Sequence, residues 1–370
     1  MRKLATIQRI KSIHPIENAD SIECITVKGW ELVAKKGEFK VNSLCCFFEI
    51  DSFLPNEPRF EFLKDLKTHQ GTQGYRLRTK KLRGQISQGL AMPLSEFPEL
   101  PFHIEDLDVT DALKVIKYDN QIPERKGNVR IGKVDGKFPE FLPKTDQERI
   151  QNLTAWFERY NHLEWEETLK LDGSSMSCFK IKRKFSIFDK LKKLFGIKVP
   201  DYKFGVCSRN LELRKSDNFT KQFDNNGQVT EHNQSDYWKV ALRYDIENVL
   251  PIGYAVQGEL IGEKIQSNHE KIEGLDFYVF DVYNIAEQRY LTPTERAEMF
   301  TKELKPLKHV PILGVVKILR HCPNIPSLLE RVKGESMNKG TISEGRVYKA
   351  MGGTKSFKCI NNDYLLRCET

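Results

Sequence analysis

The sequence lacks the features that would place this 370-residue chain among membrane-spanning, disordered or disulfide-stapled proteins. No run approaches the roughly 20 consecutive apolar residues that a spanning helix needs. The eight cysteines are scattered and include no C-x-x-C pair, which argues against a zinc ribbon and against a disulfide framework. The segment from Met1 to Lys11 has no continuous apolar stretch, so no signal peptide is expected. With 39% hydrophobic and 30% charged residues, the composition is that of a folded globular protein.

The chain also lacks a strong charge of one sign. Lys and Arg total 59 against 51 acidic residues, for a net charge of +8. This modest excess excludes a histone-like tail, but it is compatible either with a basic groove for a polyanion or with a surface that is merely rich in lysine. Because free thiols are normal in reducing compartments, we expect a cytoplasmic or nuclear protein. We further expect a monomer with no membrane partner.

The order of predicted elements indicates two regions. Residues 1–135 contain short β-branched and aromatic runs, such as Ile22–Val27, Trp30–Ala34 and Leu44–Ile50, which are closely spaced by turns. Many short strands with few helices predict a small β-barrel. Residues 136–370 mix strands and helices from Thr168 onward, as in an α+β domain.

Two further segments carry local signals. Thr145 and Glu148 have the spacing of a capping box, which predicts a helix that begins there and carries Arg149 and Gln151. Between Lys180 and Lys198, eight basic residues accompany apolar residues at helical spacing, which predicts a basic amphipathic helix. Such a helix could be a solvated element packed on its domain, a nucleic-acid contact or a membrane-surface element.

The segment from Thr168 to Gly173 has the clearest chemical potential. Lys170 ends a strand-like run, two residues before Asp172 and Gly173, and the glycine allows a tight turn that would expose the lysine at the rim of a pocket. A lysine amine attacks phosphorus or carbonyl centres only when it is unprotonated, so nearby cations or desolvation must lower its pKa. Taken alone, the pattern also describes an ordinary surface lysine at a turn.

Later segments add polar residues at the ends of strand-like runs. They contain Ser208 and Arg209; Glu259 between glycines; Tyr278 and Phe280 on one face of the run Phe277–Tyr283; Glu344 before Gly345; and Lys355 and Lys358. Taken singly, the acids could be solvated, the aromatic run could be plain core, and the lysines could lie on the surface. Their occurrence together and in this order favours a single site.

This ordered set resembles the covalent nucleotidyltransferase superfamily of polynucleotide ligases and mRNA capping enzymes. The residues after Lys358 are too few for the barrel that DNA ligases and capping enzymes place there. The segments 13–20, 36–39, 48–55, 84–90 and 143–151 instead resemble RNA ligases that carry an amino-terminal OB domain and seal nicks with an RNA 3′-OH end.

The resemblance implies an amino-terminal OB-like β-barrel with its linker (1–135), followed by an α+β nucleotidyltransferase domain, an ATP-grasp-like ligase domain (136–370). It implies an ATP-dependent RNA ligase that seals 3′-OH/5′-phosphate breaks or nicks through lysyl-AMP and an adenylylated 5′ end. The partner would be RNA or an RNA-containing nicked duplex. The natural substrate, the choice between nicks and splinted breaks, and any end-healing enzyme are not specified by the sequence.

The resemblance also assigns roles to residues. The implied catalytic residues are Lys170, Asp172, Glu259, Glu344 and Lys358. Asp172, Glu259 and Glu344 would hold Mg²⁺ or Mn²⁺, largely through water. The implied ATP-binding residues are Arg149, Thr168, Leu169, Lys170, Arg209, Glu259, Phe280, Glu344, Lys355 and Lys358. Phe280 would stack on adenine, with Tyr278 as the alternative.

The nucleic-acid contacts of the barrel are expected in one basic run, which could instead be a solvated charge run. Its members are Arg76, Arg78, Lys80, Lys81 and Arg83. The sequence departs from the family pattern at two places. The basic segment 180–198 looks longer than usual, and Ile360 stands where related ligases often have a second lysine, so Lys358 must act alone or with help from Lys355.

Two other functions stay open. The first is a capping-type guanylyltransferase, which the missing carboxy-terminal barrel disfavours. The second is a catalytically inactive OB-type nucleic-acid-binding protein, which the joint presence of Lys170, Asp172, Glu259, Glu344 and Lys358 disfavours.

Overall fold

A computed structural model describes residues 2–118, 134–183, 194–195, 199–216, 220–223, 229–232, 234–353 and 355–368. The central part of the predicted basic helix, 184–193 and 196–198, lies outside the described residues. Residues 119–133 also lie outside them, so the division of the chain near residue 135 stays a prediction. Among the described residues, no helix combines the length and the apolar character that crossing a membrane requires.

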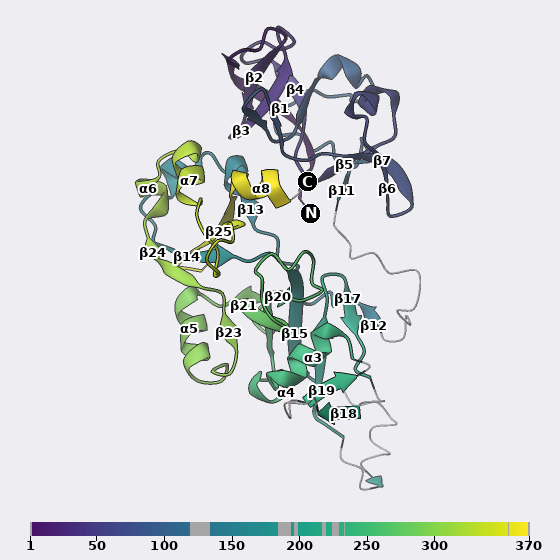
Figure 1. Ribbon diagram of the computed structural model, residues 1–370, viewed down its shortest axis with the longest axis vertical. Helices are drawn as coiled ribbons and strands as arrows, with labels where there is room; N and C mark the ends of the chain where they lie inside the picture. Colours follow the sequence, from purple (N-terminus) through teal and green to yellow (C-terminus); the bar gives the residue numbers. More distant parts are fainter. Residues whose placement is uncertain are drawn as a thin grey trace.

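The amino-terminal region consists of curled antiparallel sheets (Figure 1). A five-stranded sheet has the order β10 (Leu90–Pro93), β4 (Leu44–Phe48), β1 (Ala5–Pro15), β2 (Ile22–Val27) and β3 (Trp30–Lys35). A four-stranded sheet has the order β11 (Ile116–Lys117), β5 (Ser52–Pro55), β7 (Thr72–Arg76) and β6 (Leu66–His69). The remaining elements are the hairpin β8 (Lys80–Leu82) and β9 (Gln85–Ser87) and the 3-10 turns η1 (Pro58–Leu63) and η2 (Leu94–Glu96).

The curl of this region begins in β1. Its first half pairs with β4 and its second half pairs with β2, and the register shifts between Ile10 and Ser12. A bulge of this kind bends a strand and increases its twist. Apolar side chains therefore gather in two clusters, one around Phe48 and Phe60 and the other around Trp30. The predicted barrel of short strands is confirmed in this sense.

The second region contains two larger sheets. One sheet has the order β12 (Val134–Lys137), β17 (Leu211–Leu213), β16 (Tyr202–Cys207), β15 (Ser174–Lys182), β20 (Tyr254–Gly262), β21 (Leu275–Asn284) and β22 (Arg289–Tyr290), with β23 (Lys308–His309) beside β21. The other has the order β13 (Glu148–Arg149), β26 (Ser356–Ile360), β25 (Gly345–Ala350), β14 (Trp165–Lys170) and β24 (Ile312–Val316). The hairpin β18 (Thr220–Phe223) and β19 (Val229–His232) stands apart from both.

Short helices surround these sheets. They are η3 (Ile150–Asn152), α1 (Trp156–Arg159), α3 (Asp236–Arg243), α4 (Ile246–Val249), α5 (Pro293–Thr301), α6 (Ile318–His321), α7 (Ile325–Arg331) and α8 (Asn362–Cys368). The α+β architecture predicted for this region is therefore confirmed.

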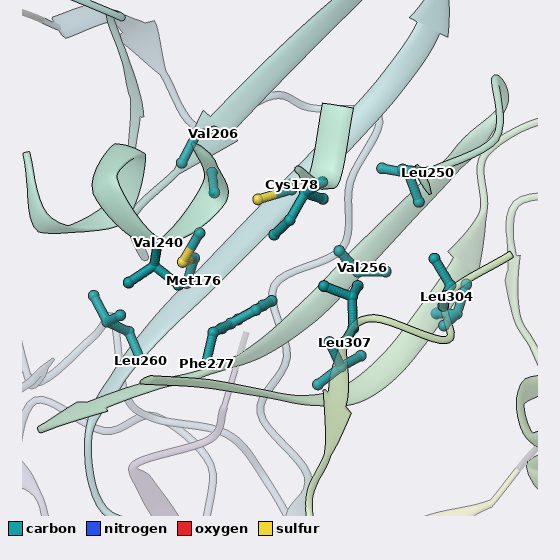
Figure 2. Packing of buried hydrophobic residues seen from close by; sticks show 14 of the residues in the cluster. Met176, Cys178, Val206, Val240, Leu250, Val256, Leu260, Phe277, Leu304 and Leu307 are labelled. Carbon is teal, nitrogen blue, oxygen red and sulfur yellow. The ribbon is translucent and has the colours of Figure 1, made fainter. Parts of the chain in front are cut away.

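Alternation along β15 and β20 decides where a site can form. Met176, Cys178, Val256 and Leu260 point to one face and pack in the main core, which also includes Val240 of α3 (Figure 2). Because strand side chains alternate, the intervening residues face the opposite way, toward the sheet that contains β14. There Ile261 packs with Leu169 and Leu171, so the two sheets meet at this point.

The carboxy-terminal helix α8 joins the two regions (Figure 1). Tyr364 and Leu365 are buried in the cluster around Trp30 of the amino-terminal sheets. The Gln88 side chain donates a hydrogen bond to Asn362 Oδ1 at 3.1 Å. Trp30 Nε1 donates to Asn152 Oδ1 at 2.6 Å, also across the two regions.

Two local predictions need correction. The helix expected from the capping-box spacing does not begin at Thr145, because Glu148–Arg149 forms the strand β13 beside β26 and the 3-10 turn η3 follows. Glu148 Oε1 instead accepts hydrogen bonds from Asn152 and from the backbone N–H of Arg149, so tertiary contacts replace the capping box. The basic helix expected from Lys180 does not begin there, because Lys180 and Lys182 belong to the strand β15. Lys180 is buried, and its Nζ donates to the carbonyl of Glu247 at 2.8 Å.

The seven cysteines whose environment is described are buried and form no disulfide. This arrangement agrees with the absence of a disulfide framework expected from their spacing.

Candidate active site

Lys170 lies at the seam between the two sheets, at the carboxyl end of β14. β14 pairs antiparallel with β25 so that Lys170 lies opposite Gly345, and Glu344 therefore comes next to the Lys170 side chain. The two Glu344 carboxylate oxygens lie 2.7 Å from Lys170 Nζ. Lys170 is only partly covered, with 28% of its side chain exposed.

Two glycines beside this ion pair lie close to neighbouring strands. A Cβ at Gly173 would lie 2.4 Å from the carbonyl oxygen of Leu260, so only glycine fits where the chain passes from β14 into β15. Gly345 has φ +151°, and a Cβ there would lie 2.3 Å from the Cys359 carbonyl oxygen. The passage at Gly173 places Ser175 opposite Glu259 in the adjacent strand β20.

The charges around Lys170 determine its protonation. Burial lowers the pKa of Lys170, but the ion pair with Glu344 and the nearby carboxylates of Glu259 and Asp172 outweigh burial, so its pKa is raised. Burial, with the charges of Glu344 and Asp172, raises the pKa of Glu259 to about 8, although Lys170 opposes the shift. The isolated site therefore keeps the lysine cationic and crowds three carboxylates around it.

A second charged cluster lies where the amino-terminal region meets β13 and β26. Lys358 Nζ lies 2.7 Å from Asp146 Oδ1, and Lys117 Nζ lies 2.8 Å from Asp146 Oδ2. Arg149 contacts Asp51 at 3.2 Å, and Arg2 contacts the same carboxylate at 3.4 Å. Burial lowers the pKa of Lys358 to about 8, with Arg149 and Arg2 acting in the same direction and Asp146 opposing. Cations are therefore concentrated on this side of the site.

Both clusters line one cavity of about 710 Å³. The cavity contains nearly all of the residues predicted for catalysis and nucleotide binding, namely Arg149, Thr168, Leu169, Lys170, Asp172, Arg209, Glu259, Phe280, Glu344 and Lys358. The Phe280 ring lines it, whereas the alternative Tyr278 packs beside Leu169 and Ile261. Ile360, which stands in place of a second lysine, also borders the cavity.

Lys355 does not border this cavity, contrary to the prediction. It precedes β26 by one residue, on the opposite face of the strand from Lys358, because side chains alternate. Its Nζ lies 4.9 Å from the centre of the Tyr160 ring, and the side chain lines a separate hollow with Lys317 and His162. Lys355 therefore cannot assist Lys358 in this structure.

Several cavity residues were missed by the sequence analysis. Arg2, Asp51 and Lys117 come from the amino-terminal region, which was expected only to bind nucleic acid. Lys349 is buried, lies 2.7 Å from Asp281 Oδ1 and donates to the carbonyl of Phe280, so it holds the strand that carries the aromatic ring. Its position, five residues after Glu344 on β25, is the only sequence signal that could have identified it.

Tyr237 is a further missed residue. It projects from α3 into the cavity, and its hydroxyl hydrogen-bonds to Ser174. Burial, with the nearby Glu259 charge, raises the pKa of Tyr237 to about 12, so the phenol is neutral and can donate or accept. No motif in the sequence distinguishes this tyrosine from the other eleven.

The basic run of the amino-terminal region divides into two groups. The Arg76 guanidinium lies 4.4 Å from the Tyr118 ring centre, and Arg78 reaches Asp65 at 3.5 Å. Lys80, Lys81 and Arg83 are exposed on the β8–β9 hairpin, and no ion pair of theirs is found among the described residues. These three remain the candidates for a nucleic-acid contact.

The predicted metal ligands Asp172, Glu259 and Glu344 all line the cavity. Among the described residues, no group of three or more acidic, histidine or cysteine side chains is arranged so that it could hold a metal ion. The carboxylates nevertheless surround one lysine, and burial together with the charges of Glu344 and Asp172 raises the pKa of Glu259, which a nearby hard cation would oppose. Mg²⁺ usually keeps several of its waters and binds only a few protein ligands directly.

Comparisons with known proteins agree with this arrangement. A family profile of an OB-fold domain matches residues 4–94, and the RNA ligase family profile matches residues 163–360. The structure of Naegleria gruberi RNA ligase with PPi is 38% identical, with a TM-score of 0.82, and the match covers 99% of this chain and 98% of that chain. A search of curated proteins yields no match.

Two mutants of the Naegleria ligase match equally well. The structure with ATP and Mn is 39% identical, with a TM-score of 0.81, and that with AMP and Mn is 39% identical, with a TM-score of 0.82. Each match covers 98% of this chain and 98% of that chain. The similarity therefore extends over both regions.

The contact at Gly173 can be tested by stability. We expect Gly173→Ala to lower the free energy of unfolding by about 1–3 kcal/mol, because the new methyl group overlaps the Leu260 carbonyl. Gly136→Ala is the matched control, since its Cβ would meet no atom within 4 Å. Thermal unfolding of both variants measures the difference. Equal melting temperatures for the two would show that the passage beside Leu260 tolerates a side chain.

Proposed function

The chain belongs to the RNA ligase family, and we propose that it joins RNA 3′-OH and 5′-phosphate ends with ATP through a covalent lysyl-AMP at Lys170. The observation that carries this proposal is the position of Lys170. Its Nζ lies 2.7 Å from Glu344, in a cavity that Glu259, Asp172, Phe280 and Lys358 also line. A partly exposed amine among carboxylates, near an aromatic ring and separate cations, has the components that nucleotidyl transfer needs.

In the first step, Lys170 Nζ attacks the α-phosphorus of ATP. The N–P bond forms, the bond from that phosphorus to the β-phosphate bridging oxygen breaks, and pyrophosphate leaves. Lys170 must lose a proton beforehand, and its ion pair with Glu344 opposes this loss. A divalent cation held by Asp172, Glu259 and Glu344 would supply positive charge that stabilises the phosphate oxygens and lowers the pKa of Lys170. Engagement of Glu344 there would also weaken its pairing with the amine.

The second cluster suits the leaving pyrophosphate. Lys358 of β26 pairs with Arg149 of the neighbouring strand β13, and both residues line the cavity. Guanidinium and ammonium groups bind phosphate oxygens strongly. The Naegleria relative was solved with PPi, which is consistent with such a subsite in this chain.

In the proposed later steps, AMP moves from Lys170 to the RNA and is then released. AMP passes from Lys170 to the 5′-phosphate of the RNA, which breaks the N–P bond and frees the amine. The 3′-OH then attacks the activated phosphate, and AMP leaves. Phe280 and Lys349 would keep the adenosine in place during both steps, because Lys349 fixes the backbone at Phe280.

The lysyl-AMP can be detected directly. Wild-type protein incubated with α-³²P-ATP and Mg²⁺ should retain label on a denaturing gel, and Lys170→Ala should retain none, because no other amine replaces Nζ. Lys355→Ala is the matched control and should label like wild type, since Lys355 lies outside the cavity. Label obtained only from GTP would favour a capping-type guanylyltransferase, and no label at all would favour an inactive binding protein.

The substrate class can be tested with nicked duplexes. We expect efficient sealing when the strand that supplies the 3′-OH ends in RNA, and sealing reduced about tenfold or more when it ends in DNA, since only RNA offers a 2′-OH at that position. The measurement is the rate of sealing with RNA or DNA on either side of the nick. Equal rates for all four duplexes would contradict the proposed preference for RNA.

The exposed β8–β9 hairpin is proposed to contact the nucleic-acid backbone. Replacing both Lys80 and Lys81 with alanine should weaken RNA binding and reduce the slope of log affinity against log salt by about 1–2. Each phosphate contact that is lost reduces the number of counterions released on binding. Lysyl-AMP formation should not change, as neither residue lines the cavity. Replacement of exposed Lys302 and Lys305 removes the same charge elsewhere and is the control. Equal slopes for the two double variants would rule out the hairpin contact.

A further inference from the structure

The loop between β20 and β21 has an unusual backbone close to the site. Lys264, Gln266, Asn268 and Lys271 all have positive φ, between 48° and 66°. A residue other than glycine at positive φ costs free energy, so surrounding contacts must hold the loop in this conformation. The Asn268 side chain provides one brace, since it exchanges two hydrogen bonds of 3.1 Å with the backbone of Ile272.

Within this loop, Glu270 is completely buried. Its Oε1 accepts a hydrogen bond from the Ser336 hydroxyl at 2.9 Å, and its backbone carbonyl accepts one from Asn338. Among the described residues, no hydrogen-bond partner of Oε2 is found. Burial raises the pKa of Glu270, and the Ser336 hydroxyl, His269 and the Asp172 N–H oppose this shift. The two hydrogen bonds to Ser336 and Asn338 therefore anchor the loop to the segment before Glu344.

Neighbouring loop residues contact the same two segments. Gln266 Nε2 donates to the Gly173 carbonyl at 2.8 Å, on the turn that follows Lys170. His269 Nε2 lies 2.6 Å from the carbonyl of Ile342, two residues before Glu344. The loop therefore touches the backbone on both sides of the Lys170–Glu344 ion pair.

From these contacts we infer that Glu270 is a positioning residue, which fixes the Lys170–Gly173 turn relative to the segment 336–344 that carries Glu344. Glu270 holds its loop to Ser336 and Asn338 on one segment, and Gln266 of the same loop holds the Gly173 carbonyl on the other. Glu270 does not line the cavity, so it acts through the backbone that it holds. The inference rests on the proposed function, because the positioned groups are those assigned to lysine adenylylation.

A positioning role differs measurably from a purely structural one. Loss of the clamp should misplace Lys170 Nζ and Asp172 while the adenosine contacts at Phe280 stay in place. Small displacements of reacting groups reduce rates strongly without an equal loss of binding. The expected result is a decrease of kcat with little change of KM. General destabilisation would instead lower the melting temperature without a selective decrease of kcat.

The experiment measures single-turnover lysyl-AMP formation over a range of ATP concentrations. Glu270→Ala should lower the maximal rate by about tenfold and change the half-saturating ATP concentration by less than about threefold. Glu270→Gln should recover most of the rate, because its amide oxygen can still accept from the Ser336 hydroxyl. Ser336→Ala, which removes only one donor, should give a smaller loss of rate and provides a readout if Glu270→Ala does not fold.

Asp276→Asn is the matched control. Asp276 is a buried carboxylate on β21 that pairs with Lys308 at 2.6 Å and lies outside the cavity, so its loss should lower the melting temperature and leave the rate unchanged. The inference is overturned if both Glu270→Ala and Ser336→Ala react at the wild-type rate, or if Glu270→Gln is as slow as Glu270→Ala. Absence of lysyl-AMP in the wild-type protein would instead contradict the proposed function.

Discussion

The ion pair between Lys170 and Glu344 is the constraint on which the rest of the site depends. It joins the end of β14 to the start of β25 at 2.7 Å, and it keeps the lysine cationic where an uncharged amine would be needed for attack. Every nearby feature bears on this pair. Gly173 and Gly345 let the chain beside the pair pass close to β20 and β26, Glu259 and Asp172 add negative charge, and the β20–β21 loop contacts the backbone on both sides. The site therefore keeps the proposed nucleophile protonated until other charges rearrange.

The amino-terminal sheets contribute to the cavity as well as to the predicted grip on nucleic acid. Arg2, Asp51 and Lys117 lie on its wall and connect through Asp146 and Arg149 to the strand of Lys358. Buried ion networks of this kind add little net stability, because desolvation offsets the Coulombic gain, but breaking one partner is costly. The cationic side of the cavity thus requires both regions of the chain to be docked.

Much of the site could be predicted because its residues sit in short local patterns. Lys170, Asp172 and Gly173 are close in sequence, and each later strand carries its polar residue beside a glycine or an aromatic run. Arg2 and Lys117 were not predictable, since only tertiary docking brings them to the cavity and no neighbouring residue marks them. The helix expected at Thr145 failed for the same reason, as pairing with β26 outweighed a local capping signal. Lys355 failed because a single position in a strand reverses the side-chain direction.

The contacts of the helix α8 bear on when the site can assemble during synthesis of the chain. Its Tyr364 and Leu365 complete the cluster around Trp30, and the Tyr364 ring packs edge-on against His269 of the β20–β21 loop at 5.1 Å. α8 is made more than three hundred residues after Trp30, so the amino-terminal sheets must wait for that length of synthesis before this apolar surface is covered. A nascent chain would have no assembled cavity until α8 had been made.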